Sequence, residues 1–71
     1  MWIPVEERKP TNHCEVLMYL PIEGYVVGYW DANMYSFKRD YKEFDRDGEE
    51  YICSEKVYPT HWALLEPPMI D

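Results

Sequence analysis

The sequence has 71 residues, of which 14 are acidic and seven are basic, so its formal net charge is −7 at pH 7. A chain of this length forms one small domain, predicted over residues 1–71, and buries only about 60% of the surface that its unfolded form exposes. The negative charge repels phosphate backbones and disfavours direct binding to DNA or RNA, whereas it attracts basic protein surfaces. The simpler alternative is that the charge only keeps the protein soluble.

No apolar run in the chain approaches the roughly 20 residues of a membrane-spanning helix, so we expect a soluble protein without a membrane partner. Residues 1–8 also lack the basic start and apolar run of an export signal. The two cysteines, Cys14 and Cys53, have no paired spacing. We therefore expect reduced thiols and a cytoplasmic location.

The central predicted element is a hairpin over residues 15–31. Its strands, 16–20 and 25–30, are rich in aromatic and β-branched residues, and Pro21-Ile22-Glu23-Gly24 between them has the composition of a turn. Both faces of this hairpin are apolar or aromatic, so each needs a cover. A four-residue loop sets the facing pairs as Leu20 with Tyr25, Met18 with Val27, Val16 with Tyr29, Tyr19 with Val26, Leu17 with Gly28 and Glu15 with Trp30.

After a turn at Asp31-Ala32-Asn33, residues 34–38 alternate apolar with polar side chains and are predicted to form a third strand. Residues 39–50 are strongly polar and contain the turn pair Asp47-Gly48, so we expect an exposed, mobile loop there. This loop is the candidate partner-binding site. Its members are the carboxylates Asp40, Glu43, Asp45, Asp47, Glu49 and Glu50, with the aromatic residues Tyr41 and Phe44 as anchors or contact residues.

The two ends of the chain complete the predicted sheet. Residues 1–10 read as an extended N-terminal arm, because Pro4 disfavours a central strand, and its Trp2 is expected to cover one hairpin face. Residues 60–65 form the last strand, and Glu66-Pro67-Pro68 ends regular pairing. The predicted fold is therefore mainly β, a small antiparallel sheet of three to four strands. The predicted structural core is Trp2, Val16, Leu17, Met18, Val27, Tyr29, Trp30, Phe37 and Trp62.

Several short motifs at the two ends of the chain occur together. They are Trp2-Ile3, Val5, Glu7-Arg8 and Pro10 at the start, Val16-Leu17 with Tyr19 in the first strand, and Thr60-His61-Trp62 followed by Leu65-Glu66-Pro67-Pro68. In these positions the sequence resembles domain-of-unknown-function family 551. The resemblance covers most of the chain except residues 40–55. It implies a phage or prophage protein of a bacterial host cell, and it assigns no catalytic residue.

The sequence contains no standard metal or catalytic motif. A calcium loop with Gly48 at its sixth position would begin at Glu43 and place Ser54 where a bidentate glutamate is required. A cysteine nucleophile with His61 has no motif around it, and so small a sheet has little room for a pocket. We therefore expect no enzyme activity, no metal and no cofactor. A zinc site would have to use non-standard spacing between His13, Cys14, Cys53 and His61.

These observations favour a non-enzymatic interaction module. The leading hypothesis is a phage-type inhibitor whose acidic segment docks on the basic surface of a host protein, such as a nucleic-acid-handling defence protein. The second is a structural or self-associating module, in which a hairpin face or Trp62 packs against another copy. The third is a small-ligand binder that uses Tyr25, Tyr29 and Trp30 as a stacking platform.

Overall fold

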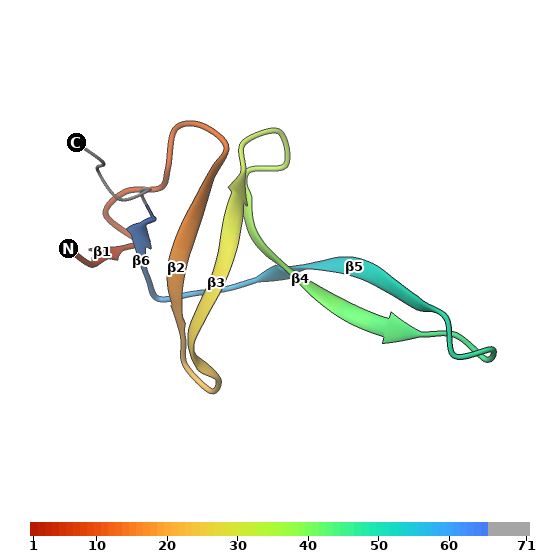
Figure 1. Ribbon diagram of the computed structural model, residues 1–71. Coiled ribbons are helices and arrows are strands. Elements are labelled where there is room, and N and C mark those ends of the chain that lie inside the picture. The colour runs from red at the N-terminus through yellow and green to blue at the C-terminus, as the bar shows by residue number, and fades with distance from the viewer. Residues whose placement is uncertain (66–71) are drawn as a thin grey trace, which may run out of the picture.

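The computed structural model describes residues 1–65, which form one antiparallel sheet in the order β1-β6-β2-β3-β4-β5 (Figure 1). This confirms the predicted mainly β, antiparallel fold, but the predicted number of three to four strands is wrong, because the sheet has six. The end of pairing expected at residues 66–68 lies outside the described residues. The strands are β1 (Ile3–Pro4), β2 (Cys14–Leu20), β3 (Gly24–Asp31), β4 (Ser36–Phe44), β5 (Glu50–Val57) and β6 (His61–Leu64).

The central hairpin exists, but its predicted register is wrong by one residue. Leu20 pairs with Gly24 instead of Tyr25, and Val16 pairs with Gly28 instead of Tyr29. The cause is Gly24, whose φ of 84° lets it stand at the end of a three-residue turn and still pair as the first residue of β3. A shift of one residue exchanges the two faces of a strand, so it changes which side chains lie in the core.

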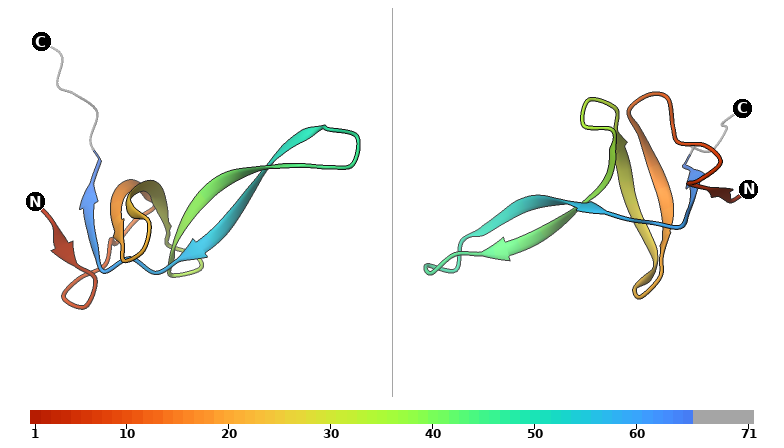
Figure 2. Two further views of the ribbon diagram at one scale, coloured as in Figure 1. Left: turned by 90° about the horizontal axis from the view of Figure 1, so that it is seen from below. Right: turned by 180° about the vertical axis from the view of Figure 1, so that it is seen from behind.

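The polar segment predicted as a mobile loop is a second hairpin. Strand β4 continues from Ser36 to Phe44, and β5 returns beside it from Glu50 to Val57. Turn chemistry closes this hairpin, because Gly48 has a φ of 82° and its N–H donates to the Asp45 carbonyl at 3.1 Å. Both views of Figure 2 show β4 and β5 projecting together away from the other strands. The composition of this segment is typical of a loop, but the turn at Asp45–Gly48 closes it into a two-stranded antiparallel ribbon.

One face of the sheet holds the core, and we call it the core face. Its buried side chains come from β2, β3, β4, β5 and β6, and they are Val16, Met18, Leu20, Trp30, Phe37, Val57 and Trp62. The N-terminal segment crosses this face, where Val5 packs against the core, Pro10 is buried, and the Trp62 indole N–H donates to the Arg8 carbonyl at 2.8 Å. A covering loop thus takes the place of a second layer.

The opposite face, which we call the open face, carries Leu17, Tyr19, Tyr25, Val27 and Tyr29. Val27 is 59% exposed, and Leu17 and Tyr29 are half-buried but lie outside the core cluster. The prediction of these three as core residues is therefore wrong. The one-residue register error explains it, since Val27 pairs with Leu17 and not with the buried Met18.

Trp2 was also predicted in the core, but it is exposed. It precedes β1, which is not a free arm but pairs with β6 through Ile3 opposite Trp62. This pairing turns Ile3 toward the core face and Trp2 toward the open face, because successive side chains alternate. There the Trp2 ring contacts Tyr25, with ring centroids 5.8 Å apart.

Candidate functional site

The candidate site is the projecting part of the second hairpin, residues 40–54, which we call the acidic hairpin. Strand β5 pairs with β4 alone, and every residue from 40 to 52 is exposed. Within residues 1–65, no layer covers either face of this ribbon, in contrast to the core face. All eight predicted partner-binding residues lie on it, so the structure brings together Asp40, Tyr41, Glu43, Phe44, Asp45, Asp47, Glu49 and Glu50.

Two of the six carboxylates are engaged within the hairpin itself. The Asp45 carboxylate accepts the backbone N–H groups of Asp47 and Glu49, both at 2.9 Å, and so holds the turn. Glu50 forms an ion pair with Lys42 at 3.2 Å across the two strands. Among residues 1–65, the other four carboxylates have no ion pair and no side-chain hydrogen bond. These are Asp40, Glu43, Asp47 and Glu49.

The charge of the hairpin is divided along its length. Residues 40–52 hold six carboxylates and two cationic side chains, whereas the base of the hairpin carries Lys38, Arg39 and Lys56 with Glu55 as its one carboxylate. The negative charge is therefore concentrated at the end that projects from the molecule. A charged, water-exposed tip of this kind raises the rate of encounter with a basic surface.

The acidic hairpin also exposes apolar side chains on both of its faces. Phe44 is 62% exposed and Ile52 is 64% exposed, and they are diagonal neighbours on one face. Tyr41 and Tyr51 have the same relation on the other face and are also exposed. Sequence reasoning identified Tyr41 and Phe44 but missed Tyr51 and Ile52. Only the pairing of β4 with β5 places these last two beside the carboxylates.

Ion pairs fix the base of the hairpin against the central strands. The Arg39 guanidinium donates to both carboxylate oxygens of Glu23 and, at 2.8 Å, to Glu55. Its hydrogen bond lowers the pKa of Glu23, and the two carboxylates raise the pKa of Arg39. Lys38 bonds Asp31 at 3.0 Å and lowers the pKa of that carboxyl in the same way. These charged contacts join the base of the hairpin to β3 and to the turn between β2 and β3.

The residues considered for a zinc site are far apart in the sheet. Cys14 is on β2 and Cys53 is on β5, with β3 and β4 between them. The Nδ1 atom of His13 accepts the Ala32 N–H at 3.2 Å, and that of His61 lies 2.9 Å from the Thr60 hydroxyl. Within the described residues, no group of three or more His, Cys, Asp or Glu side chains is placed to hold a metal ion.

Two pKa values are raised at the thiols, that of Cys14 itself and that of Tyr41 beside Cys53. Burial raises the pKa of the Cys14 thiol. At the other thiol, the charge of Cys53 and then burial raise the pKa of the Tyr41 phenol, with Glu43 adding to the effect. Tyr41 is therefore a neutral hydrogen-bonding group at neutral pH.

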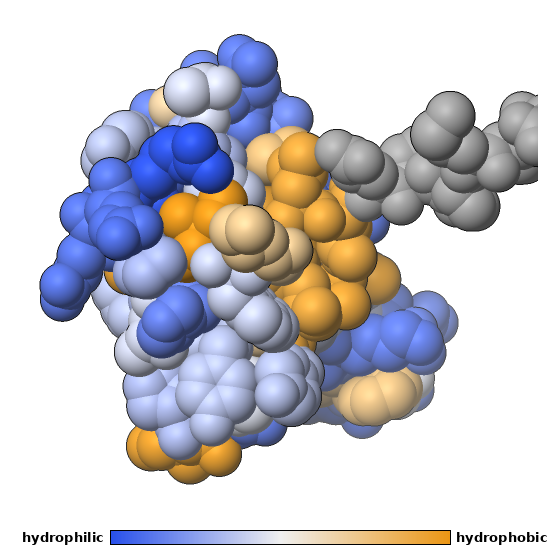
Figure 3. Space-filling model, turned by 90° about the vertical axis from the view of Figure 1, so that its left-hand side faces the viewer, coloured by the Kyte–Doolittle hydropathy of each residue, from blue (hydrophilic) through white to orange (hydrophobic). Residues whose placement is uncertain are grey.

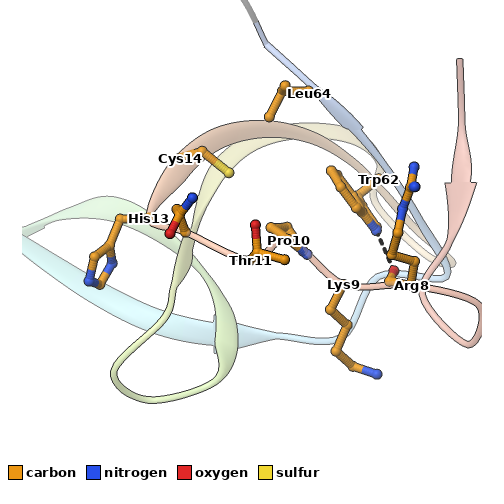
Figure 4. Close-up of a pocket in the computed structure, with 9 residues that line it drawn as sticks. Arg8, Lys9, Pro10, Thr11, His13, Cys14, Trp62 and Leu64 are labelled. Carbon is orange, nitrogen blue, oxygen red and sulfur yellow. Dashed lines mark hydrogen bonds between the residues drawn. The ribbon is translucent and has the colours of Figure 1, made fainter.

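A pocket of about 490 Å³ lies between the N-terminal segment and the β2–β6 end of the core face (Figure 4). The Cys14 sulfur points toward it, whereas the His13 ring points away (Figure 4). The Trp62 indole N–H, from another residue that lines this pocket, already donates to the Arg8 carbonyl. The adjacent histidine and cysteine thus do not converge on one point, as a nucleophile and its base must.

The predicted stacking platform of Tyr25, Tyr29 and Trp30 does not exist, because Trp30 is buried on the core face and the two tyrosines lie on the open face. The aromatic hollow on the open face, about 280 Å³, is lined by Trp2, Tyr19, Tyr25 and His61. Trp62 is also buried, so it is not free to pack against another copy.

Strand β6 and the residue after it expose further apolar side chains, Leu64 and Leu65. Figure 3, which views the molecule from the side of β1 and β6, shows apolar side chains gathered in the middle of this surface. No helix in the described part of the chain is long and apolar enough to cross a membrane.

The fold and site define a small, single-sheet β protein with a projecting acidic hairpin. The chain belongs to the family described as "Protein of unknown function (DUF551)", whose model matches residues 1–69. The match includes the acidic hairpin, which the sequence motifs at the two ends did not cover. No curated protein and no solved structure matched the chain.

Proposed function

We propose that this protein is a non-enzymatic interaction module of the phage or prophage type, which acts in the bacterial cytoplasm by docking its acidic hairpin on a basic surface of a host protein. The observation that carries this proposal is the projection of residues 40–54 as a ribbon that no other part of residues 1–65 covers. Four of its carboxylates have no partner within those residues. Structural roles account for Asp45 and Glu50, but not for Asp40, Glu43, Asp47 and Glu49.

The exposed apolar pairs support a contact that goes beyond charge. Charged groups at the rim of an interface mainly set the rate of association, whereas buried aromatic and aliphatic anchors supply most of the affinity. Phe44 and Ile52 offer such anchors on one face, close to Glu49 and Glu50. The hairpin therefore combines steering charge with contact area on one narrow element.

The shape of the hairpin favours a groove as its docking surface. A two-stranded ribbon is narrow enough to enter the major groove of DNA, and a protein channel that holds nucleic acid is lined with Lys and Arg. An acidic ribbon can occupy such a channel in place of the nucleic acid. The proposed class of partner is thus a nucleic-acid-handling host protein, including defence proteins, and the expected effect is inhibition.

The test is a capture experiment from a bacterial lysate with the tagged full chain and a charge-matched pair of variants. The first variant neutralises unpartnered carboxylates of the hairpin, Glu43→Gln, Asp47→Asn and Glu49→Gln, and leaves Asp45 and Glu50 intact. The second neutralises three exposed carboxylates elsewhere, Glu6→Gln, Glu7→Gln and Glu15→Gln. Both lose the same net charge, so they differ only in its location.

We expect the native chain and the second variant to capture the same basic protein at low salt, and the first variant to lose it. High salt should weaken the capture, because the steering charges are screened. Equal capture by all three proteins would contradict the proposal. Equal loss in both variants would also contradict it, since the net charge and not the hairpin would then be responsible.

A further inference from the structure

The two edges of the sheet are very different. Strand β1 has two residues and contains Pro4, which limits pairing on that side. Strand β5 at the other edge has eight residues, Glu50–Val57, without proline or glycine. Among the described residues no strand pairs with its outer side (Figure 1). A long and regular edge of this kind is a template for another strand.

Alternate residues of β5 direct their backbone groups outward. At the tip, the Asp45 N–H donates to the Glu49 carbonyl at 3.0 Å. Antiparallel pairs alternate between hydrogen-bonded and non-hydrogen-bonded positions, so Tyr51 and Cys53 also bond inward to β4. The backbone groups of the even-numbered residues therefore face the free edge. These residues are Glu50, Ile52, Ser54 and Lys56.

One cation on this strand lacks a partner. Lys56 stands directly opposite Lys38, and Lys38 is already bonded to Asp31. Among residues 1–65, Lys56 forms no ion pair, and like charges in facing positions destabilise a sheet. The same strand carries Glu50 at its other end. The outer edge thus presents a carboxylate and an unpaired ammonium group at two outward-bonding positions.

We propose that β5 pairs with β5 of a second copy of this chain, antiparallel and centred on Cys53. In this register Glu50 faces Lys56 of the other copy, and the two-fold symmetry makes this ion pair twice. Ile52 faces Ser54, Tyr51 faces Glu55, and the two Cys53 residues face each other at a non-hydrogen-bonded position. The sheets of the two copies join into one continuous sheet.

The charges select this register over its neighbours. Outward-bonding residues must face each other, so alternative registers differ by steps of two residues. A step in one direction places Glu49 opposite Glu55, which is repulsive. In that register Glu50 no longer faces Lys56. A step in the other direction places Lys56 opposite Ile52 and Glu50 opposite Tyr58, so no ion pair forms. Of these three registers, only the one centred on Cys53 pairs Glu50 with Lys56.

The charge division along the hairpin also favours the antiparallel arrangement. The tip is acidic and the base carries Lys38, Arg39 and Lys56. Two hairpins that run in opposite directions place each acidic tip toward the cationic base of the other. The inference is independent of the proposed host partner, because pairing uses the edge of β5 and leaves the faces with Phe44 and Ile52 uncovered by the second backbone.

The first test is sedimentation equilibrium of the full chain with the charge reversals Glu50→Lys, Lys56→Glu and the two combined. We expect the native chain to form a dimer, each single reversal to weaken it about tenfold, and the double reversal to restore it. Glu50→Lys also disturbs the pair with Lys42, so rescue by the second change distinguishes contact between copies from damage within one hairpin. A monomer at all concentrations, or no rescue, would overturn the proposal.

The second test reads the register through disulfide formation. In a Cys14→Ser background, diamide takes one hydrogen from each of two facing Cys53 thiols, is itself reduced to the hydrazine, and leaves a disulfide-linked dimer. Facing residues in the non-hydrogen-bonded position meet the geometry that this bond requires. Moving the thiol by one residue, with Cys53→Ser and Ser54→Cys, should abolish the product. Equal cross-linking of both variants would contradict the register.

Discussion

The central strands and the acidic hairpin belong to one sheet, but they are stabilised in different ways. Strands β2, β3 and β6 lie under the N-terminal segment, and Val16, Met18 and Trp30 are almost inaccessible to solvent. No other segment of the described chain covers the acidic hairpin, and its pairing depends on the Asp45 turn and on cross-strand contacts. Burial therefore dominates in the first region and local geometry in the second. The comparison teaches that a small protein can keep its core in one part of a sheet and extend another part for recognition.

The core of the central region is an aromatic cluster. The Trp30 ring packs edge to face against Phe37 at 4.7 Å and against Tyr35 at 5.0 Å, and Phe37 lies 6.5 Å from Trp62. Large rings bury much area per residue, which matters in a chain that has few core positions. The residues of this cluster should therefore respond most strongly to substitution.

The largest expected effect is that of Trp30→Ala, which removes the largest of the fully buried side chains of the core. We expect a loss of about 3–5 kcal/mol in the free energy of unfolding, because the neighbouring rings cannot fill the cavity. The matched change in the other region, Phe44→Ala, should alter stability by less than about 0.5 kcal/mol. Urea unfolding followed by tryptophan fluorescence measures both, and similar losses would show that the two regions are not distinct.

The next effect is that of Gly28→Ala at the close contact between β3 and its neighbours. A methyl group at this position collides with the Lys38 carbonyl oxygen and with the terminal methyl of Met18. Because one of these atoms belongs to the backbone of β4, we expect a loss of about 3 kcal/mol. Gly28 lies at an ordinary φ, so the cost arises from packing and not from backbone strain. An unchanged thermal midpoint would show that β4 can move away freely.

The third prediction concerns Trp62, whose hydrogen bond holds the N-terminal segment against the core face. The change Trp62→Phe removes the indole donor and leaves the Arg8 carbonyl without its partner. We expect a loss of about 1–3 kcal/mol. Faster proteolysis within residues 5–12 would locate the effect in the covering segment. Equal protease resistance in the variant and the native chain would indicate that apolar contacts alone hold that segment.

The smallest effect concerns the junction between the two regions. Arg39 lowers the pKa of Glu23, so this carboxylate contributes stability above its ordinary pKa of 4.5, and that contribution is lost as the pH falls through the lowered value. Glu23→Gln should reduce the thermal midpoint slightly at neutral pH. The difference from the native chain should vanish in acid, where Glu23 is protonated. A difference that does not depend on pH would exclude the ion pair as its source.

The sequence allowed the antiparallel β fold and much of the core to be predicted. Aromatic and β-branched residues with turn signals between them indicate strands, and Val16, Met18, Trp30, Phe37 and Trp62 are all buried as expected. The register could not be read in the same way. Whether Gly24 belongs to the turn or to the strand depends on its φ, and this choice of one residue decided that Val27 faces Leu17 and is exposed, whereas Met18 is buried.

The main error of the sequence-based prediction was to assign a loop to the acidic hairpin, because its residues have a low intrinsic preference for strands. Asp and Glu dominate it, and its apolar residues Tyr41, Phe44, Tyr51 and Ile52 do not alternate in sequence as they would on a half-buried sheet. The turn at Asp45 and Gly48, the diagonal ion pair of Lys42 with Glu50 and the facing pair of Arg39 with Glu55 support the pairing instead. The carboxylates were visible in the sequence, but which of them are engaged depends on this register.

Amide hydrogen exchange of the native chain, at a concentration where it is monomeric, tests the division of the sheet most directly. The amides of β2, which is paired on both sides and covered, should exchange only through global unfolding. The inward-bonded amides of the acidic hairpin, at Glu43 and Tyr51, should exchange orders of magnitude faster through local opening of the ribbon. Equal protection of both sets would contradict the account, because the hairpin would then be held as firmly as the core.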